Sequence, residues 1–432
     1  MNRKRLSTHV LPRDVGHALT ACAVLVWVIL WAAPSAVRAQ SPAAADVSLR
    51  QAFEAAWAIQ PEAAGLPARR DAVRAQQQLA RAWSSAPLTL DVLTKTDALS
   101  RNQGEREIEL GVAVPLWLPG ERSRSQSLAA AEGRAIESRL AAAQLRVAGS
   151  VRDAWWSWQR ARAEVDVARA QQVNAGRIAA DVTKRLRAGD LARADQHQAD
   201  GAVLAADVAV TQAETAVTVT ELHLRSMTQL QSAFRVNSQT EQEPLMTAVE
   251  AQASNEAHAD LTALADKLAV ADSSAALTAA QSRANPELTV AATRGRGAFG
   301  EPFNQTLTVG IRVPFGGGSR FDARTANARA DVAELQAQLV IERARLGAER
   351  LAASVRTESA RTQLAAAERR TLLARESRGF FEKSFQLGQT DLPLRLRIEA
   401  EAADAERQST RARIELAAAI SVWLQALGRL PQ

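Results

Sequence analysis

The sequence predicts a mainly α-helical protein with four β-strands per chain, built as two tandem copies of one structural unit. Aromatic residues make up only 4% of the 432 residues and Tyr is absent, whereas a compact globule of this length would use more rings to fill its core. The chain is instead rich in Ala, Arg, Gln, Glu and Leu, a composition typical of long helices. Four landmarks recur at one constant spacing of 199 positions: Pro87 and Pro286, Gly111 and Gly310, Val114 and Val313, and Gly189 and Gly388.

Residues 1–39 have the pattern of an export signal peptide. A basic start precedes an apolar run of 13 residues at 21–33, which is shorter than the roughly 20 residues of a membrane-spanning helix. Small residues before Gln40 suit cleavage there. Cys22 ends a lipoprotein-like tetrapeptide, but charged residues precede it and the apolar run follows it, so we expect no lipidation. Because Cys22 is the only cysteine, the mature chain is expected to have no disulfide or cysteine metal site.

Each copy begins with a predicted helix that ends before a proline. We assign residues 40–236 to the first copy, 237–244 to a polar linker and 245–432 to the second copy. Entry helices are predicted at 47–84 and 245–282. Pro87 and Pro286 follow them, because proline lacks the amide hydrogen and disfavours helix in the residue before it.

Two alternating segments follow each entry helix. Apolar and polar residues alternate near 87–97, 105–115, 286–296 and 303–313, and a period of two predicts strands with one apolar and one polar face. Loops at 100–104 and 294–302 predict that each pair is a hairpin. The junction with the next helix is assigned to Pro115 and Gly120 in the first copy and to Pro314 and Gly316 in the second.

A very long helix is predicted after each hairpin, at 121–187 and 319–385. At 1.5 Å per residue each would extend about 100 Å, and small apolar residues recur along both at coiled-coil spacing. Trp155, Trp156 and Trp158 lie in the first of these helices, and we interpret them as core residues. Glycine just past a helix end is a common stop, so turns are predicted at Gly189 and Gly388, with return helices at 191–232 and 392–427.

The amphipathic strands predict a membrane barrel made by several chains. Four strands cannot close a barrel alone, and an open edge in lipid leaves unpaired amides that cost several kcal/mol each. Strands of about ten residues suit a bilayer-spanning barrel, and three chains would supply twelve. The long charged helices exceed a bilayer about 30 Å thick and must project into water. The alternative is a small soluble sheet on a periplasmic rod.

This order of elements, over residues 46–428, resembles the TolC-like outer membrane factors, also called outer membrane efflux proteins. The strand exits at 114–122 (VPLWLPGER) and 313–317 (VPFGG) look most like the subgroup that serves heavy-metal efflux pumps. The resemblance implies a homotrimer with a 12-stranded β-barrel in outer-membrane lipid and a helical coiled-coil barrel in the periplasm. It also implies a periplasmic adaptor and an inner-membrane pump, of the RND type, as partners, and passive conduction without enzymatic turnover.

By the same resemblance, the two helix turns are periplasmic tips that close the entrance and contact the adaptor. The residues assigned to these tips are Arg185, Gly189, Asp190, Arg193, Asp195, Gly388, Asp391, Arg395 and Arg397. Arg395 and Arg397 stand where family members often carry acids, so an acidic ring from the second tip alone is not expected. We expect Asp190, Asp195 or Asp391 to contact Arg193, Arg395 or Arg397 in the closed state.

No motif for catalysis, a cofactor or a resident metal stands out. The segment 314–320 (PFGGGSR) lies between a strand and a helix but lacks the lysine of a phosphate loop. His197, His223 and His258 are not spaced as metal ligands. The carboxylates follow helix periodicity beside Arg, as solvated partners do, and basic residues interspersed with acids argue against nucleic-acid binding.

The sequence therefore favours an outer-membrane exit duct of a tripartite efflux system that carries heavy-metal cations. A duct for drugs, or for polypeptides of type I secretion, is an alternative with the same fold. A periplasmic coiled-coil adaptor or scaffold is an alternative of another class. Trimers extracted from the outer membrane would favour the duct, and release by osmotic shock would favour the scaffold.

Overall fold

A computed structural model describes residues 47–230, 243–244, 258–316 and 318–432, all within the unit Asp46–Gln432. The predicted signal peptide, most of the predicted linker and the start of the predicted helix 245–282 lie outside these residues. The first half of the chain forms α1 (Leu49–Ala58), α2 (Pro61–Arg81), β1 (Thr89–Thr96), β2 (Arg106–Pro115), α3 (Glu121–Ala188) and α4 (Arg193–Thr228). The second half forms α6 (Ala259–Ala280), β3 (Glu287–Arg296), β4 (Asn304–Arg312), α7 (Gly318–Gln386) and α8 (Leu392–Ala426).

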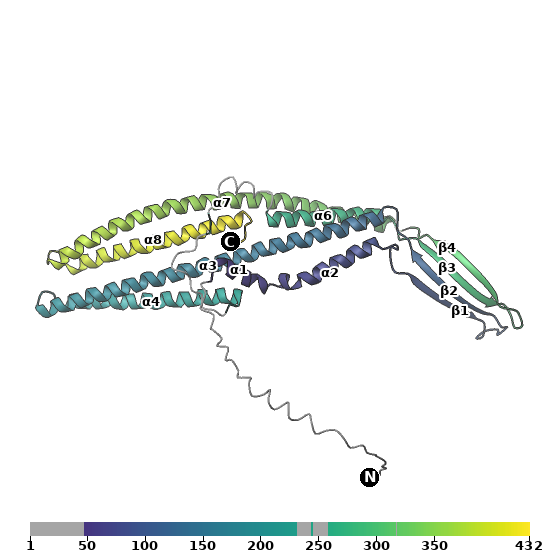
Figure 1. Cartoon of the computed structure of the whole chain (residues 1–432), viewed down its shortest axis with the longest axis horizontal. Coiled ribbons are helices and arrows are strands. Elements are labelled where there is room, and N and C mark those ends of the chain that lie inside the picture. Colours follow the sequence, from purple (N-terminus) through teal and green to yellow (C-terminus); the bar gives the residue numbers. More distant parts are fainter. Residues whose placement is uncertain (1–46, 231–242, 245–257, 317) are drawn as a thin grey trace, which may run out of the picture. The chain divides into compact units, whose positions relative to one another are not determined.

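The two very long helices are present and differ from their predicted bounds by one residue at most. α3 has 68 residues and α7 has 69. The predicted small and apolar positions face other helices: Val151, Ala154 and Val165 of α3 are buried, as are Leu346 and Ala353 of α7. α4 packs along α3, and α8 packs along α7 (Figure 1). Each pair is therefore a helical hairpin held by close contacts between small side chains.

The prediction of one continuous entry helix over 47–84 is wrong. The chain forms α1 and α2 instead, with a break at Ile59 and Gln60. Pro61 is the first residue of α2; it has no amide hydrogen to donate, and it holds Gln60 in an extended conformation (ψ 140°). Helix α2 ends at Arg81, three residues before the predicted end.

The strands form one antiparallel sheet in the order β1-β2-β3-β4. Each observed strand lies within its predicted segment. β3 continues to Arg296, so the second hairpin loop begins at Gly297 and not at Arg294 as predicted. β2 pairs with β3 along ten positions, from Arg106 opposite Arg296 to Pro115 opposite Glu287. The two halves of the chain therefore share one sheet.

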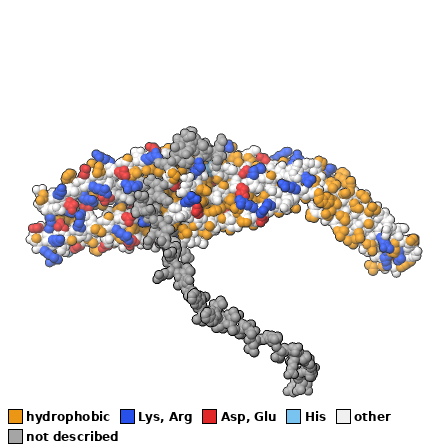
Figure 2. All heavy atoms as spheres, viewed as in Figure 1, with side chains coloured by type: hydrophobic (Ala, Val, Ile, Leu, Met, Phe, Trp, Pro, Cys, Tyr) orange, Lys and Arg blue, Asp and Glu red, His pale blue; other side chains and the backbone are white. Residues whose placement is uncertain are grey.

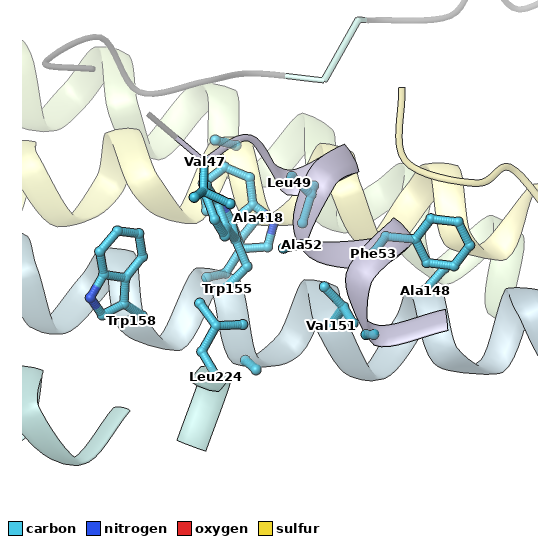
Figure 3. Packing of buried hydrophobic residues seen from close by; sticks show 14 of the residues in the cluster. Val47, Leu49, Ala52, Phe53, Ala148, Val151, Trp155, Trp158, Leu224 and Ala418 are labelled. Carbon is cyan, nitrogen blue, oxygen red and sulfur yellow. The ribbon is translucent and has the colours of Figure 1, made fainter. Parts of the chain in front are cut away.

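The main hydrophobic core surrounds the tryptophans of α3. Trp155 is fully buried, and its ring contacts that of Trp158 edge to face at 5.3 Å between centroids. Leu49 and Phe53 of α1 and Ala418 of α8 pack in the same cluster (Figure 3). The interpretation of these tryptophans as core residues is confirmed. They anchor both ends of the described chain to the middle of α3.

A buried ion pair lies beside this core. Arg152 of α3 donates from Nη2 and Nε to the carboxylate of Glu243 at 2.6 and 3.1 Å, and both side chains are at most 5% exposed. Arg152 also donates to Oε1 of Gln425 (2.5 Å) and to the carbonyl of Arg429 (2.9 Å). Ser421 of α8 donates to the same carboxylate. A buried charge needs such complete pairing, so this network holds Glu243, a described residue between the two halves, against α3.

Candidate functional site

One face of the sheet is apolar across all four strands. The register places even-numbered residues of β1, β2 and β3 on the same face as odd-numbered residues of β4. One row across the strands consists of Leu90, Val112, Val290 and Val309, and the next consists of Val92, Leu110, Ala292 and Leu307. Figure 2 shows hydrophobic side chains gathered over the strands. Leu90 and Leu307 are each 70% exposed, which is unfavourable in water and favourable in lipid.

The opposite face is polar and more enclosed. It carries Asp91, Glu107 and Glu109, whereas Ala113 and Ala291 on the same face are buried. In the described chain, β1 pairs only with β2 and β4 only with β3, so both edges present unpaired backbone groups. A sheet that is apolar on one face, polar on the other and open at both edges can close only by pairing with further strands.

The junction between sheet and helices is built around a buried carboxylate that the sequence did not single out. Glu121, the first residue of α3, is 2% exposed. It accepts hydrogen bonds from the Leu118 amide (2.9 Å), Nε2 of Gln281 (2.7 Å) and Nδ2 of Asn285 (2.8 Å). The positive end of the α3 dipole also favours an acid here. Glu121 therefore links the connection between β2 and α3 to the segment between α6 and β3.

The four predicted junction residues lie where the strands give way to the long helices. Pro115 ends β2 and Gly120 directly precedes α3 with φ of 75°. Pro314 and Gly316 lie between β4 and α7. Their contribution to the junction stays a prediction.

Both predicted helix turns are present at glycine. Gly189 and Gly388 have φ of 89° and 74°, a conformation that side chains with a Cβ rarely adopt. The amide of Gly189 donates to the carbonyl of Leu186 (3.1 Å), and that of Gly388 to the carbonyl of Phe385 (3.0 Å). These bonds satisfy carbonyls that the helix ends would otherwise leave unpaired.

The two turns are joined by Phe385, the penultimate residue of α7. Its ring is buried against Ile178 and Val182 of α3. The Arg185 guanidinium lies 4.4 Å from the ring centroid, and its Nη1 donates to the Phe385 carbonyl at 2.9 Å. Arg395 of α8 lies 4.9 Å from the same ring. The sequence did not predict Phe385 as the anchor, because its partners on α3 are about 200 residues away.

Two of the three tip acids have local partners. Asp195 accepts from the Ala192 amide at 2.9 Å, and Asp391 accepts from the Leu394 amide at 3.1 Å. Both carboxylates therefore cap the first turn of a return helix. Asp190 is exposed.

The tip arginines also differ from the predicted pairing. Arg395, whose side chain is 7% exposed, lies 3.6 Å from a carboxylate oxygen of Glu382, and Arg397 lies 3.9 Å from one of Glu401. Arg193 is exposed. Over the described residues, none of the three predicted acids pairs with any of these arginines inside one chain. The predicted closing contacts would have to join separate copies.

A charged groove of about 910 Å³ lies between α3 and the α7–α8 hairpin. Its ion pairs cross between helices: Arg177 with Glu382 (3.6 Å), Arg375 with Glu406 (2.8 Å) and Arg378 with Glu399 (3.5 Å). The sequence predicted i,i+4 pairs along single helices and missed these, because pairing between helices depends on how the hairpins pack.

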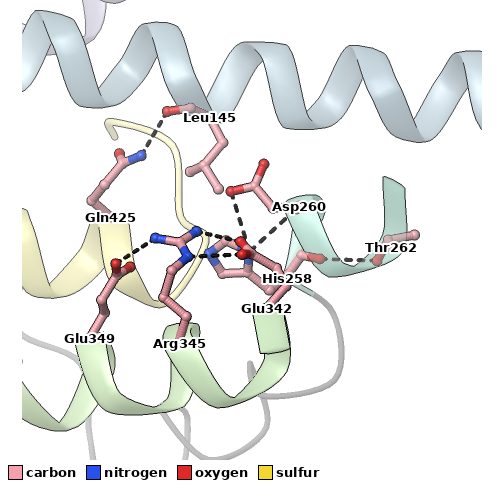
Figure 4. Close-up of polar contacts among 8 residues, drawn as sticks. All are labelled: Leu145, His258, Asp260, Thr262, Glu342, Arg345, Glu349 and Gln425. Atoms are coloured by element: carbon pink, nitrogen blue, oxygen red, sulfur yellow. Dashed lines mark hydrogen bonds and ion pairs between the residues drawn. The ribbon is translucent and has the colours of Figure 1, made fainter. Parts of the chain in front are cut away.

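A second polar cluster surrounds the start of α6 (Figure 4). Nδ1 of His258 accepts from the Asp260 amide at 3.3 Å, and burial lowers the pKa of His258 and raises that of Asp260. Arg345 of α7 binds the carboxylates of Glu342 and Glu349, and its hydrogen bond lowers the pKa of Glu342. No group of three or more His, Cys, Asp or Glu in the described chain is placed to hold a metal ion.

The described chain joins a four-stranded sheet, apolar on one face, to two long helical hairpins. Residues 58–228 match the family described as outer membrane efflux protein. No curated protein sequence matches significantly. This match to part of the chain agrees with the family resemblance that the sequence predicted; the heavy-metal subgroup is not specifically supported.

Solved channel structures share this fold. CusC, whose structures concern transmembrane channel formation, matches with a TM-score of 0.73 at 15% identity over 89% of this chain and 92% of that one. VceC of Vibrio cholerae matches with a TM-score of 0.69 at 17% identity over 88% of this chain and 96% of that one. The CmeC outer membrane channel of Campylobacter jejuni matches with a TM-score of 0.70 at 12% identity over 89% of this chain and 86% of that one.

Proposed function

We propose that this protein is the outer-membrane exit duct of a tripartite efflux system and acts by passive conduction. The observation that carries this proposal is the four-stranded sheet, which is apolar on one face, polar on the other and unpaired at both edges. Pairing β4 of one copy with β1 of the next would satisfy both edges. Three copies would give a 12-stranded barrel with the apolar face in lipid and the polar face toward the lumen.

Exposed apolar stripes on the helices support assembly from several copies. Leu204, Val208, Val219 and Leu222 of α4 are all more than half exposed, and at 100° per residue they lie within about 60° of one another around the helix. α4 is long and apolar enough to cross a membrane by length and composition. Since it packs along α3 as a return helix, we assign its exposed stripe to contact with another copy.

The helical hairpins would form the periplasmic part of the duct. A helix of 68 residues extends about 100 Å, which is too long for the bilayer and suits a tube directed at an inner-membrane partner. We propose that the tips at Gly189 and Gly388 contact a periplasmic adaptor, and that an RND-type pump supplies the cargo. Heavy-metal cations are the proposed cargo because of the strand-exit motifs at 114–122 and 313–317; drugs are the alternative.

The proposal is tested by fractionation and by conductance. The mature protein should be extracted from the outer-membrane fraction as a heat-modifiable trimer, and it should conduct ions in planar bilayers. Release as a water-soluble monomer by osmotic shock would exclude the duct and favour a periplasmic scaffold. Metal or drug sensitivity of a strain lacking the protein would then distinguish the two cargo classes.

Variants that keep the helix caps can test whether the tip acids hold the entrance closed. Asn can accept the capping hydrogen bond without the charge, so Asp195→Asn and Asp391→Asn should raise conductance without unfolding the tips, as should Asp190→Ala. Gln196→Glu, beside the same tip, is a control because it leaves all three tip acids in place. Unchanged conductance in all three acid variants would remove these residues from the gate.

A further inference from the structure

At the end where the hairpin loops lie, the apolar face of the sheet carries a cluster of cationic side chains. All the charged strand residues on the apolar face are arginines, and all lie at this end: Arg106, Arg294 and Arg296. The acidic residues of the strands, Asp91, Glu107, Glu109 and Glu287, lie on the opposite face. The apolar rows and the arginines therefore form two successive bands along one surface.

Two of these arginines face each other across the strands. Arg106 is paired in register with Arg296, and like charges in such positions are destabilising. Arg106 is partly compensated by Asp97, at 3.7 Å. Arg296 donates from Nε to the Gly104 carbonyl at 3.2 Å. In the part of the chain that the structure describes, neither Arg294 nor Arg296 has a carboxylate partner, so an external anion would relieve this repulsion.

An aromatic ring holds the uncompensated guanidiniums together. Arg294 and Arg296 lie 5.1 and 5.0 Å from the Phe303 ring centroid. Contact with a ring face leaves the edge N–H groups of a guanidinium free to donate, and arginine forks bind phosphate oxygens in pairs. Phe303 is 44% exposed, so the ring also presents apolar surface beside the charges.

We propose that Arg106, Arg294, Arg296 and Phe303, here called the arginine collar, bind the phosphate of a lipid headgroup. This inference rests on the proposed membrane function. The apolar rows directly below the collar, which include Leu110 and Leu307, would lie along the acyl chains of the same lipid. A free phosphate ion shares the headgroup chemistry but gains nothing from those rows, so the lipid is the expected occupant.

The test measures lipid affinity of the full-length trimer. Protein in phosphatidylcholine nanodiscs would be titrated with lipid A, a phosphorylated lipid, and followed by native mass spectrometry. Arg294→Gln with Arg296→Gln should weaken binding by roughly thirtyfold, since each basic side chain at an anionic membrane surface changes affinity about fivefold. Lysine at both positions should give a smaller loss, because it keeps the charge without the fork.

Matched controls separate this inference from the channel itself. Lys95→Gln with Arg312→Gln removes two cations from the opposite face and should leave lipid affinity unchanged. Inorganic phosphate should compete poorly. Equal lipid A affinity in wild type and the Gln variant, or displacement by phosphate at the same concentration, would overturn the collar. Conductance of the collar variant should match wild type, whereas a wild-type protein that forms no channel would instead refute the proposed function.

Discussion

Helices α3 and α7 occupy the same place in the two halves of the chain and have nearly the same length, yet they use their surfaces differently. α3 buries 19 residues and packs along α1, α2, α4, α6 and α8. α7 buries seven, packs along α6 and α8, and reaches α3 near the tip through Phe385 and Glu382. At the spacing of 199, Arg152 corresponds to Leu351 and Trp156 to Val355. Arg152 and Trp156 are buried, whereas Leu351 and Val355 are about two-thirds exposed.

This difference indicates that the two halves have specialised. α3 organises the core of its own chain, whereas α7 has an exposed apolar stripe that we propose contacts another copy. Val340, Leu351, Val355, Leu373 and Phe380 are exposed and fall within about 60° around the helix. Such a stripe is rare on the surface of a monomer. A repeated sequence can therefore supply both an internal scaffold and an assembly surface.

The largest effect is expected on the α7 stripe. Leu351→Asp with Val355→Asp should abolish the trimer while the separated chain keeps its helix content. Each such apolar side chain is worth about 1.5–3 kcal/mol when buried, which amounts to on the order of 10 kcal/mol over three copies. Crosslinking and native mass spectrometry would report the trimer. Val173→Asp, at an exposed site on α3, is the control, and a trimer that survives the α7 change would contradict the assignment.

The next effect concerns the core of α3. Arg152→Leu introduces the residue found at the corresponding site of α7 and leaves the Glu243 carboxylate buried without its partner. We expect a loss of about 3–5 kcal/mol in unfolding free energy, measured by chemical unfolding in detergent. Adding Glu243→Leu should recover part of it. If Arg152→Leu alone were neutral, the pair would contribute little to holding the two halves together.

A smaller effect is expected at the helix starts. Glu121→Gln replaces an acceptor of three hydrogen bonds by an amide that accepts through one oxygen only, at an expected cost of about 1–3 kcal/mol. Arg320 is the corresponding residue of the second half and is exposed, so Arg320→Gln should change stability by less than about 0.5 kcal/mol. Equal unfolding midpoints for the two variants would show that the junction is not asymmetric.

The smallest effect is a pH dependence confined to the second half. His258 corresponds to Ile59, which cannot titrate. Burial lowers the pKa of His258 below its usual 6.5, so its contribution to stability is present above that value and is lost as the pH falls below it. Charging Nδ1 would also remove its acceptor role for the Asp260 amide. The neighbouring charges are Asp260, Glu342, Arg345 and Glu349.

The measurement is the unfolding midpoint between about pH 7 and 5, the range in which the unfolded histidine titrates. His258→Asn keeps a capping acceptor and should flatten the decline, whereas His223→Asn on α4 should leave it unchanged. The raised pKa of Asp260 has the opposite sign, since its protonation at lower pH relieves an unfavourable buried charge. A decline that persists unchanged in His258→Asn would assign it to other groups.

Local patterns in the sequence determined much of this protein. The period of two predicted all four strands and the shared apolar face, because side chains alternate in any strand. Proline and glycine placed the hairpin ends and both tips, because their backbone preferences act within a few residues. Even so, Pro61 divided a helix that its composition favoured, which shows that one backbone constraint outweighs summed propensity.

Contacts distant in sequence were decided by the tertiary structure. The sequence could not pair Glu121 with Asn285, Arg152 with Glu243 or Phe385 with Arg185, because each partner lies on an element whose position follows from packing. The like-charged arginines of the collar became visible only once the register of β2 against β3 was known. Local chemistry therefore fixed which elements form, and the association of those elements fixed which side chains meet.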